Sequence, residues 1–127
     1  MFSTVTTKQI TEPIDLAYWI VNLTSAVQFS TGFTTMLASF PSGTQPLCVE
    51  VGPHSQLAGP IRQICAAERV SNNYVPTMLR SADCTESLLS ALGQLFQLDV
   101  KLDLSADSAL FPPGKILTDI PLYPWDH

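Results

Sequence analysis

Two short β-rich runs separated by helix-like sequence constrain the fold most strongly. Residues 47–51 (Leu-Cys-Val-Glu-Val) are bounded by turn residues, and Gly52 and Pro53 end the run. Residues 74–79 form the second run, in which Pro76 has no N–H to donate and therefore predicts an edge strand or a strand start. Because helical sequence follows each run, we predict an α/β unit with a mostly parallel sheet.

The spacing of apolar residues predicts the flanking helices. The clearest pattern follows Asp83, which with Glu86 fits a capping box at a helix start. A single apolar stripe then consists of Leu88, Leu89, Leu92, Leu95 and Phe96. Residues 14–21 are densely apolar and predict a buried short helix, and residues 30–39 predict a second helix.

The remaining segments are predicted from weaker signals. A helix is expected to begin near His54 or Ser55, with Pro60 distorting only its first turns. Residues 1–7 alternate weakly and predict a short strand. Residues 99–127 contain four of the ten prolines and no helical period, so they predict an extended tail that lies on a partner surface.

Composition excludes several classes of function. The net charge is −5 and the six Lys and Arg residues are dispersed, whereas nucleic-acid binding needs a basic cluster. No apolar run approaches the roughly 20 residues of a membrane-spanning helix. Cys48, Cys65 and Cys84 lack metal-ligand spacing, so we expect no zinc site, no cofactor and reduced thiols in a cytoplasmic protein. The mean hydropathy of +0.21 predicts apolar surface that is either exposed or covered by another protein.

Four segments, in order, resemble the acyltransferase domain and the following linker of fungal, iterative, highly reducing polyketide synthases. They are residues 17–23 with 27–29 ("YW-x-x-N-L … V-x-F"), residues 49–63 ("VE-x-GPHS-x-L-x-GPIRQ"), residues 74–80 with the Leu-rich helix, and residues 117–127 ("LPxYPWxH"). The resemblance covers essentially the whole chain.

The resemblance implies a fold and a chemistry. The fold would be part of the αβ-hydrolase-like large subdomain of the acyltransferase, a mostly parallel short sheet with flanking helices, over residues 1–98, and the post-acyltransferase linker over residues 99–127 as an extended tail. Family members move malonyl from coenzyme A to an acyl carrier protein through a GHSxG serine and a basic histidine. Both groups are expected outside these residues, so the resemblance assigns no catalytic residue here and predicts a truncated chain that is inactive alone.

Two positions are candidate supporting residues. The resemblance implies that the backbone carbonyl of Gln28 orients the catalytic histidine of an intact domain, whereas the alternative is an exposed polar residue. His54 would at most support the floor of the active site, and the alternative reading of His54 and Ser55 is a helix N-cap after a tight turn. Tyr18 and Trp19 are predicted to pack in the interior rather than to stack on a ligand.

Three functions stay open at this point. The first is a polyketide synthase fragment without transferase activity. The second is a docking or complementing partner of another synthase chain, through contacts with a ketosynthase–acyltransferase linker or an acyl carrier protein. The third is an independent small enzyme that would use His54 with Cys48, Cys65 or Ser55, although no complete set of base, nucleophile and orienting group is visible.

Overall fold

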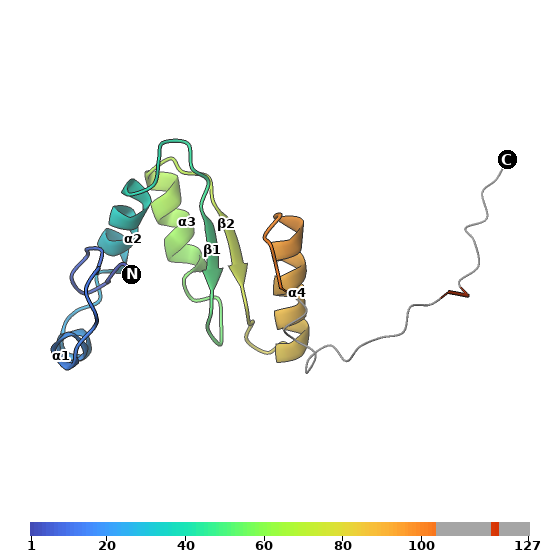
Figure 1. Ribbon diagram of the computed structural model, residues 1–127, viewed down its shortest axis with the longest axis horizontal. Coiled ribbons are helices and arrows are strands. Elements are labelled where there is room, and N and C mark those ends of the chain that lie inside the picture. Colours follow the sequence, from blue (N-terminus) through green and yellow to red (C-terminus); the bar gives the residue numbers. More distant parts are fainter. Residues whose placement is uncertain (104–117, 120–127) are drawn as a thin grey trace.

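The computed structural model describes residues 1–103 and 118–119 (Figure 1). The elements of this part are α1 (Leu16–Thr24), α2 (Phe29–Ala38), β1 (Leu47–Glu50), α3 (Ala58–Ala67), β2 (Asn73–Pro76) and α4 (Cys84–Gln97). Strands β1 and β2 pair in parallel, with Leu47 opposite Asn73 and Glu50 opposite Pro76. The α/β class, the parallel pairing and the helix expected over residues 30–39 are therefore confirmed. Most of the tail predicted over residues 99–127 lies outside the described residues.

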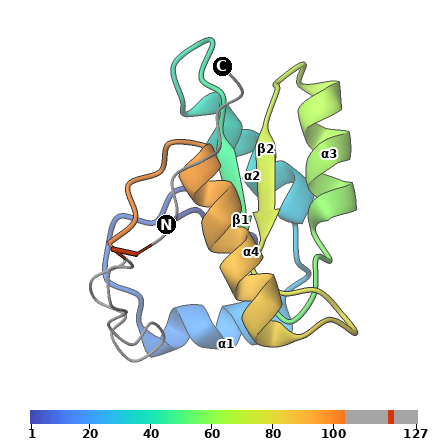
Figure 2. The same ribbon diagram turned by 90° about the vertical axis from the view of Figure 1, so that its right-hand side faces the viewer.

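Helices cover both faces of the strand pair. Helices α2 and α3 lie on one side of β1 and β2, and α4 lies on the other side (Figures 1 and 2). Helix α3 also connects the two strands, as parallel pairing requires. Helix α2 packs on α3, and α4 packs on β2. This three-layer arrangement covers β2 on the α4 side, whereas Leu47 and Val49 of β1 stay 36% and 43% exposed.

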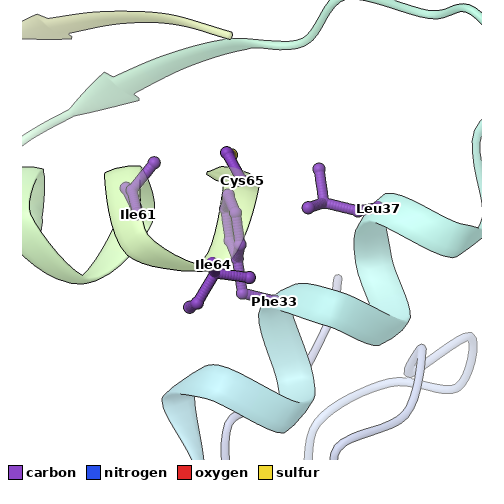
Figure 3. Packing of buried hydrophobic residues seen from close by; sticks show 5 residues of the cluster. All are labelled: Phe33, Leu37, Ile61, Ile64 and Cys65. Carbon is purple, nitrogen blue, oxygen red and sulfur yellow. The ribbon is translucent and has the colours of Figure 1, made fainter. Parts of the chain in front are cut away.

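The core lies between α2 and α3, next to the sheet. Figure 3 shows Phe33 and Leu37 of α2 meeting three residues of α3, which are Ile61, Ile64 and Cys65. Cys48 and Tyr74 from the strands are partly buried against this cluster. Because strand side chains alternate, Val75 points away from Tyr74 toward the face covered by α4, and it is only 1% exposed.

The buried face of α4 differs from the predicted stripe. Its buried residues are Ser87 and Ala91, whereas Phe96 of the stripe is 72% exposed. The small side chains of Ser87 and Ala91 allow the helix backbone to lie close to β2. Leu92 and Leu95 of the stripe are partly buried, whereas Leu89 and Phe96 are exposed. The predicted cap is confirmed, since Asp83 Oδ1 accepts hydrogen bonds from the N–H groups of Thr85 and Glu86, each at 2.9 Å.

Helix α1 forms where it was predicted, but the prediction that it is buried is wrong. Asp15 caps it by accepting a hydrogen bond from the Tyr18 N–H at 2.8 Å. None of its residues is buried, and Leu23 is 87% exposed. Figure 1 shows the reason: α1 lies to one side of the molecule, away from the strands. The Trp19 ring makes an edge-to-face contact with Tyr18, yet it stays more than half exposed instead of packing in the interior.

Residues 1–7 form a turn rather than the predicted strand. Ser3 Oγ accepts hydrogen bonds from the N–H groups of Val5 and Thr6, which bends the chain back on itself. Thr7 adopts a φ of 57°, outside the β region. Only an isolated antiparallel bridge joins Phe2 to Gln9.

Across the described residues, no helix combines the length and apolar character needed to cross a membrane.

Candidate functional site

The candidate site is the carboxyl edge of the strand pair. Both strands end at this edge because they run in parallel, and ligands of open α/β sheets bind at such edges. The loop after β1 carries His54, and the loop after β2 begins at Thr77. A groove of about 460 Å³ opens between this edge and the start of α4, and it is lined by Val51, Thr77, Met78, Cys84, Thr85 and Leu88.

Glu50, the last residue of β1, connects the elements around this edge. Its carboxylate accepts hydrogen bonds from the N–H groups of Gln56 and Leu57, both at 3.2 Å, and from the Tyr74 hydroxyl. Leu57 is the N-cap residue of α3 and has no side chain that can cap the helix. The Glu50 carboxylate therefore satisfies the N–H of this N-cap residue and of the residue before it, as the third helical residue does for the N-cap N–H in a capping box.

The backbone of Glu50 holds the second loop. Its carbonyl accepts hydrogen bonds from the N–H of Thr77 at 2.9 Å and from the hydroxyl of the same residue at 3.0 Å. Strand β2 ends at Pro76, three residues earlier than predicted. Sequence reasoning missed Glu50, and the signal available was a lone acidic residue in an otherwise apolar strand, on the same face as Cys48.

His54 lies in the loop before α3 and not at the helix start. The helix begins at Ala58, so the prediction that it starts near His54 or Ser55, with an N-cap there, is wrong. Pro60 explains the shift, because proline is accepted in the first turn of a helix but breaks a longer one. The Nδ1 atom of His54 is buried and has no hydrogen-bond partner among the described residues.

The structure does not pair His54 with a nucleophile. Within residues 1–103 no hydrogen bond links it to Ser55, to the half-buried Cys48 or to the buried Cys65. The three cysteines are free thiols. No group of three metal-binding side chains gathers in the described part of the chain.

Gln28 is the N-cap residue of α2 and is tied to the N-terminal loop. Its N–H donates to the Thr4 carbonyl at 2.6 Å, and its side-chain Nε2 donates to the Val5 carbonyl at 3.3 Å. Its own carbonyl accepts the first helical hydrogen bond, from the Gly32 N–H at 3.0 Å. No hydrogen bond joins Gln28 to His54 within the described residues, so the two candidate residues belong to different parts of the fold.

Comparison with known proteins identifies the family. No model of a described protein family matches the chain. Highly reducing polyketide synthases of Alternaria alternata and Gibberella moniliformis are 48% and 45% identical to it, each over 99% of the chain. A third, from Aspergillus fumigatus, is 44% identical over 87% of the chain. The chain corresponds to a segment of the fungal highly reducing polyketide synthases. It spans about 5% of the length of the first two relatives.

In this polyketide synthase segment, burial changes the acidity of three side chains on the core face of the sheet. Burial raises the pKa of the Cys65 thiol. Burial is the main cause that raises the pKa of the Cys48 thiol, and the electrostatic effect of the neighbouring Cys65 raises it further. Burial and the hydrogen bond to Glu50 raise the pKa of Tyr74 well above its usual range. All three groups are therefore neutral near pH 7.

These raised pKa values predict that the polyketide synthase segment loses stability in alkali. Unfolding lets Cys48 and Cys65 ionise near pH 8.5 and Tyr74 near pH 10, whereas the folded chain keeps these three protons to higher pH. The unfolded state then binds fewer protons, so the free energy of unfolding is constant below about pH 8 and falls above it. Urea unfolding between pH 7 and 11 measures this. Tyr74→Phe should flatten the part of the fall above pH 10.

Replacing Gln28 with glutamate is expected to loosen the N-terminal loop. A carboxylate cannot donate to the Val5 carbonyl, so Gln28→Glu should lower the free energy of unfolding by about 1–3 kcal/mol. Gln45→Glu is the matched control, because Gln45 makes only an exposed hydrogen bond of 3.4 Å to Ser71. Equal urea midpoints for the two variants would show that the Gln28 side chain does not hold the loop.

Proposed function

We propose that residues 1–98 are the C-terminal part of a polyketide synthase acyltransferase domain and that residues 99–127 are the linker after it. The chain then supports acyl transfer without performing it alone. The observation that carries this proposal is that His54, the one histidine of residues 1–103, has no hydroxyl or thiol in hydrogen-bond contact. The sequence also contains no GxSxG motif that could present a nucleophilic serine.

The exposed surface of α1 supports the proposal. Leu16, Trp19, Ile20 and Leu23 are all more than half exposed on a helix that is otherwise well formed and capped. Contiguous apolar surface of this kind is typical of a face that another protein surface covers. In a larger acyltransferase domain, α1 would lie in the interior, as its sequence predicts.

Gln28 and His54 have supporting roles under this proposal. A carbonyl oxygen has two lone pairs and can accept two hydrogen bonds. The Gln28 carbonyl already accepts one, from the Gly32 N–H. The second lone pair can accept a hydrogen bond from the imidazole N–H of a catalytic histidine and so fix its orientation. His54 would contribute to the floor of the site at the carboxyl edge of the sheet.

Malonyl transfer by the purified chain tests the proposal. The chain would be mixed with malonyl coenzyme A and an acyl carrier protein, and malonyl-loaded carrier would be measured by intact-protein mass spectrometry. We expect no loading above the rate without protein. An intact acyltransferase domain from a related synthase is the positive control, and steady loading by the chain alone would overturn the proposal.

A second candidate function is complementation of another synthase chain, which the exposed apolar faces of α1 and α4 favour. The partner would be a ketosynthase–acyltransferase protein from which the matching segment has been deleted. Co-purification with that protein, and recovery of malonyl loading in the mixture, are the expected results. Leu23→Glu should weaken the association, whereas Gln45→Glu, in the loop between α2 and β1, should not. Absence of binding by the unmodified chain would remove this candidate.

A further inference from the structure

The three donors on Glu50 surround a carboxylate that has no ion-pair partner among the described residues. Two of these donors are backbone N–H groups at the start of α3, where the partial positive charge of the helix end favours an anion. The third is the hydroxyl of Tyr74, which lies on the neighbouring strand. Hydrogen bonds to an ionised acceptor are about twice as strong as neutral ones, so this half-buried carboxylate is well satisfied.

These bonds close a ring around the loop that carries His54. The loop leaves β1 at Glu50 and returns to the carboxylate of the same residue through the N–H groups of Gln56 and Leu57. A further hydrogen bond inside the loop, from the Gln56 N–H to the His54 carbonyl, is 2.9 Å long. The His54 backbone is therefore two residues from an anchored amide, and its imidazole Nδ1 is held in a buried position.

We infer that Glu50 is a positioning residue, which fixes the His54 loop and, through its carbonyl, the Thr77 loop in one arrangement at the carboxyl edge of the sheet. The identification of this edge as the floor of an acyl-transfer site rests on the proposed function. The positioning of the two loops by Glu50 does not depend on that function. Glutamine replaces Glu50 only in part, because it removes the charge and one acceptor oxygen, so that the two N–H groups share one neutral amide oxygen and the NH₂ group turns toward the Tyr74 hydroxyl. Aspartate is one methylene too short to reach both anchors.

Hydrogen exchange and side-chain NMR of Glu50→Gln test the inference, with Glu68→Gln as the control at an exposed carboxylate. In Glu50→Gln we expect the exchange protection of the Gln56 and Leu57 amides to fall about tenfold or more. We also expect the imidazole ¹⁵N signals of His54, assigned with His54→Gln, to shift. Glu68→Gln should change neither. Unchanged protection at Gln56 and Leu57, with unchanged His54 signals, would overturn the inference.

A titration of the unmodified chain keeps the test valid if Glu50→Gln does not fold. The amide signals of Gln56 and Leu57 should move together with the side-chain carboxyl carbon of Glu50 as that group is protonated. The Thr85 and Glu86 amides should follow Asp83 in the same way and so provide an internal standard. Gln56 and Leu57 amides that do not respond to Glu50 would contradict the inference. Neither result depends on acyl transfer, so malonyl loading by the chain would defeat the proposed function without affecting this one.

Discussion

Replacing Phe33 with alanine is expected to lower the free energy of unfolding by about 3–5 kcal/mol, because truncating a buried phenylalanine removes its transfer energy and leaves a cavity. Phe33 is 8% exposed and lies at the centre of the cluster between α2 and α3. Natural domains of this size are stable by about 5–15 kcal/mol, so the loss would be a large part of the total.

Phe40→Ala is the matched control for Phe33→Ala. Phe40 follows α2, is 44% exposed and lies outside the buried cluster, so its truncation should cost less than about 1 kcal/mol. Urea unfolding followed by circular dichroism measures both variants. If the two substitutions lowered stability equally, the cluster between α2 and α3 would not be the core of the molecule.

Cys84 is expected to react with iodoacetamide about 100-fold or more faster than Cys65. The Cys84 thiol is exposed, whereas Cys65 is 2% exposed, and burial raises the pKa of its thiol. The thiolate is the reactive form, so Cys65 is protected both by its burial and by its low ionised fraction. It should react only when the core opens, which is a rare event in a folded domain.

Peptide mass spectrometry of a labelling time course at pH 8 measures this ratio. Cys48, which is half-buried, should react at an intermediate rate. In concentrated urea the three rates should become similar, since unfolding removes the burial that separates them. Similar rates under native conditions would contradict the packing of Cys65 in the core.

Local sequence signals predicted helices and strands well where a single residue determines where the element begins or ends. Asp83 predicted the start of α4, because its carboxylate can serve the first free N–H groups of a helix. The β-rich run at residues 47–51 predicted β1 to within one residue. The start of α3 was placed too early, although Pro60 carried enough information to locate it in the first turn.

Burial was harder to predict than secondary structure, because an apolar pattern does not show which neighbour covers it. The leucine-rich side of α4 gives the stronger pattern, yet Ser87 and Ala91 face the strand because their small size allows close approach. Helix α1 is as apolar as a core helix but meets no second layer in the described chain. Under the proposed function, the rest of a larger protein would cover both surfaces.

The candidate site could be predicted only in part. The sequence located the loop that carries His54, because glycine and proline mark the end of β1. The role of Glu50 could not be derived, since it depends on Tyr74 from the other strand and on two amides six and seven residues further along the chain. Contacts of this kind exist only after the strands pair.

The order of contacts along the chain has a consequence for how the molecule assembles. Helix α2 packs on α3, β1 pairs with β2, and α4 packs on β2, so each contact joins elements close together in sequence. Folding of such a chain can begin at β1, α3 and β2 and grow outward in both directions, and its slow step is expected to be the parallel pairing of the strands, which must first close the loop through α3. Because α4 follows this unit in the sequence and covers β2, a nascent chain can bury Val75 only after α4 has been synthesised.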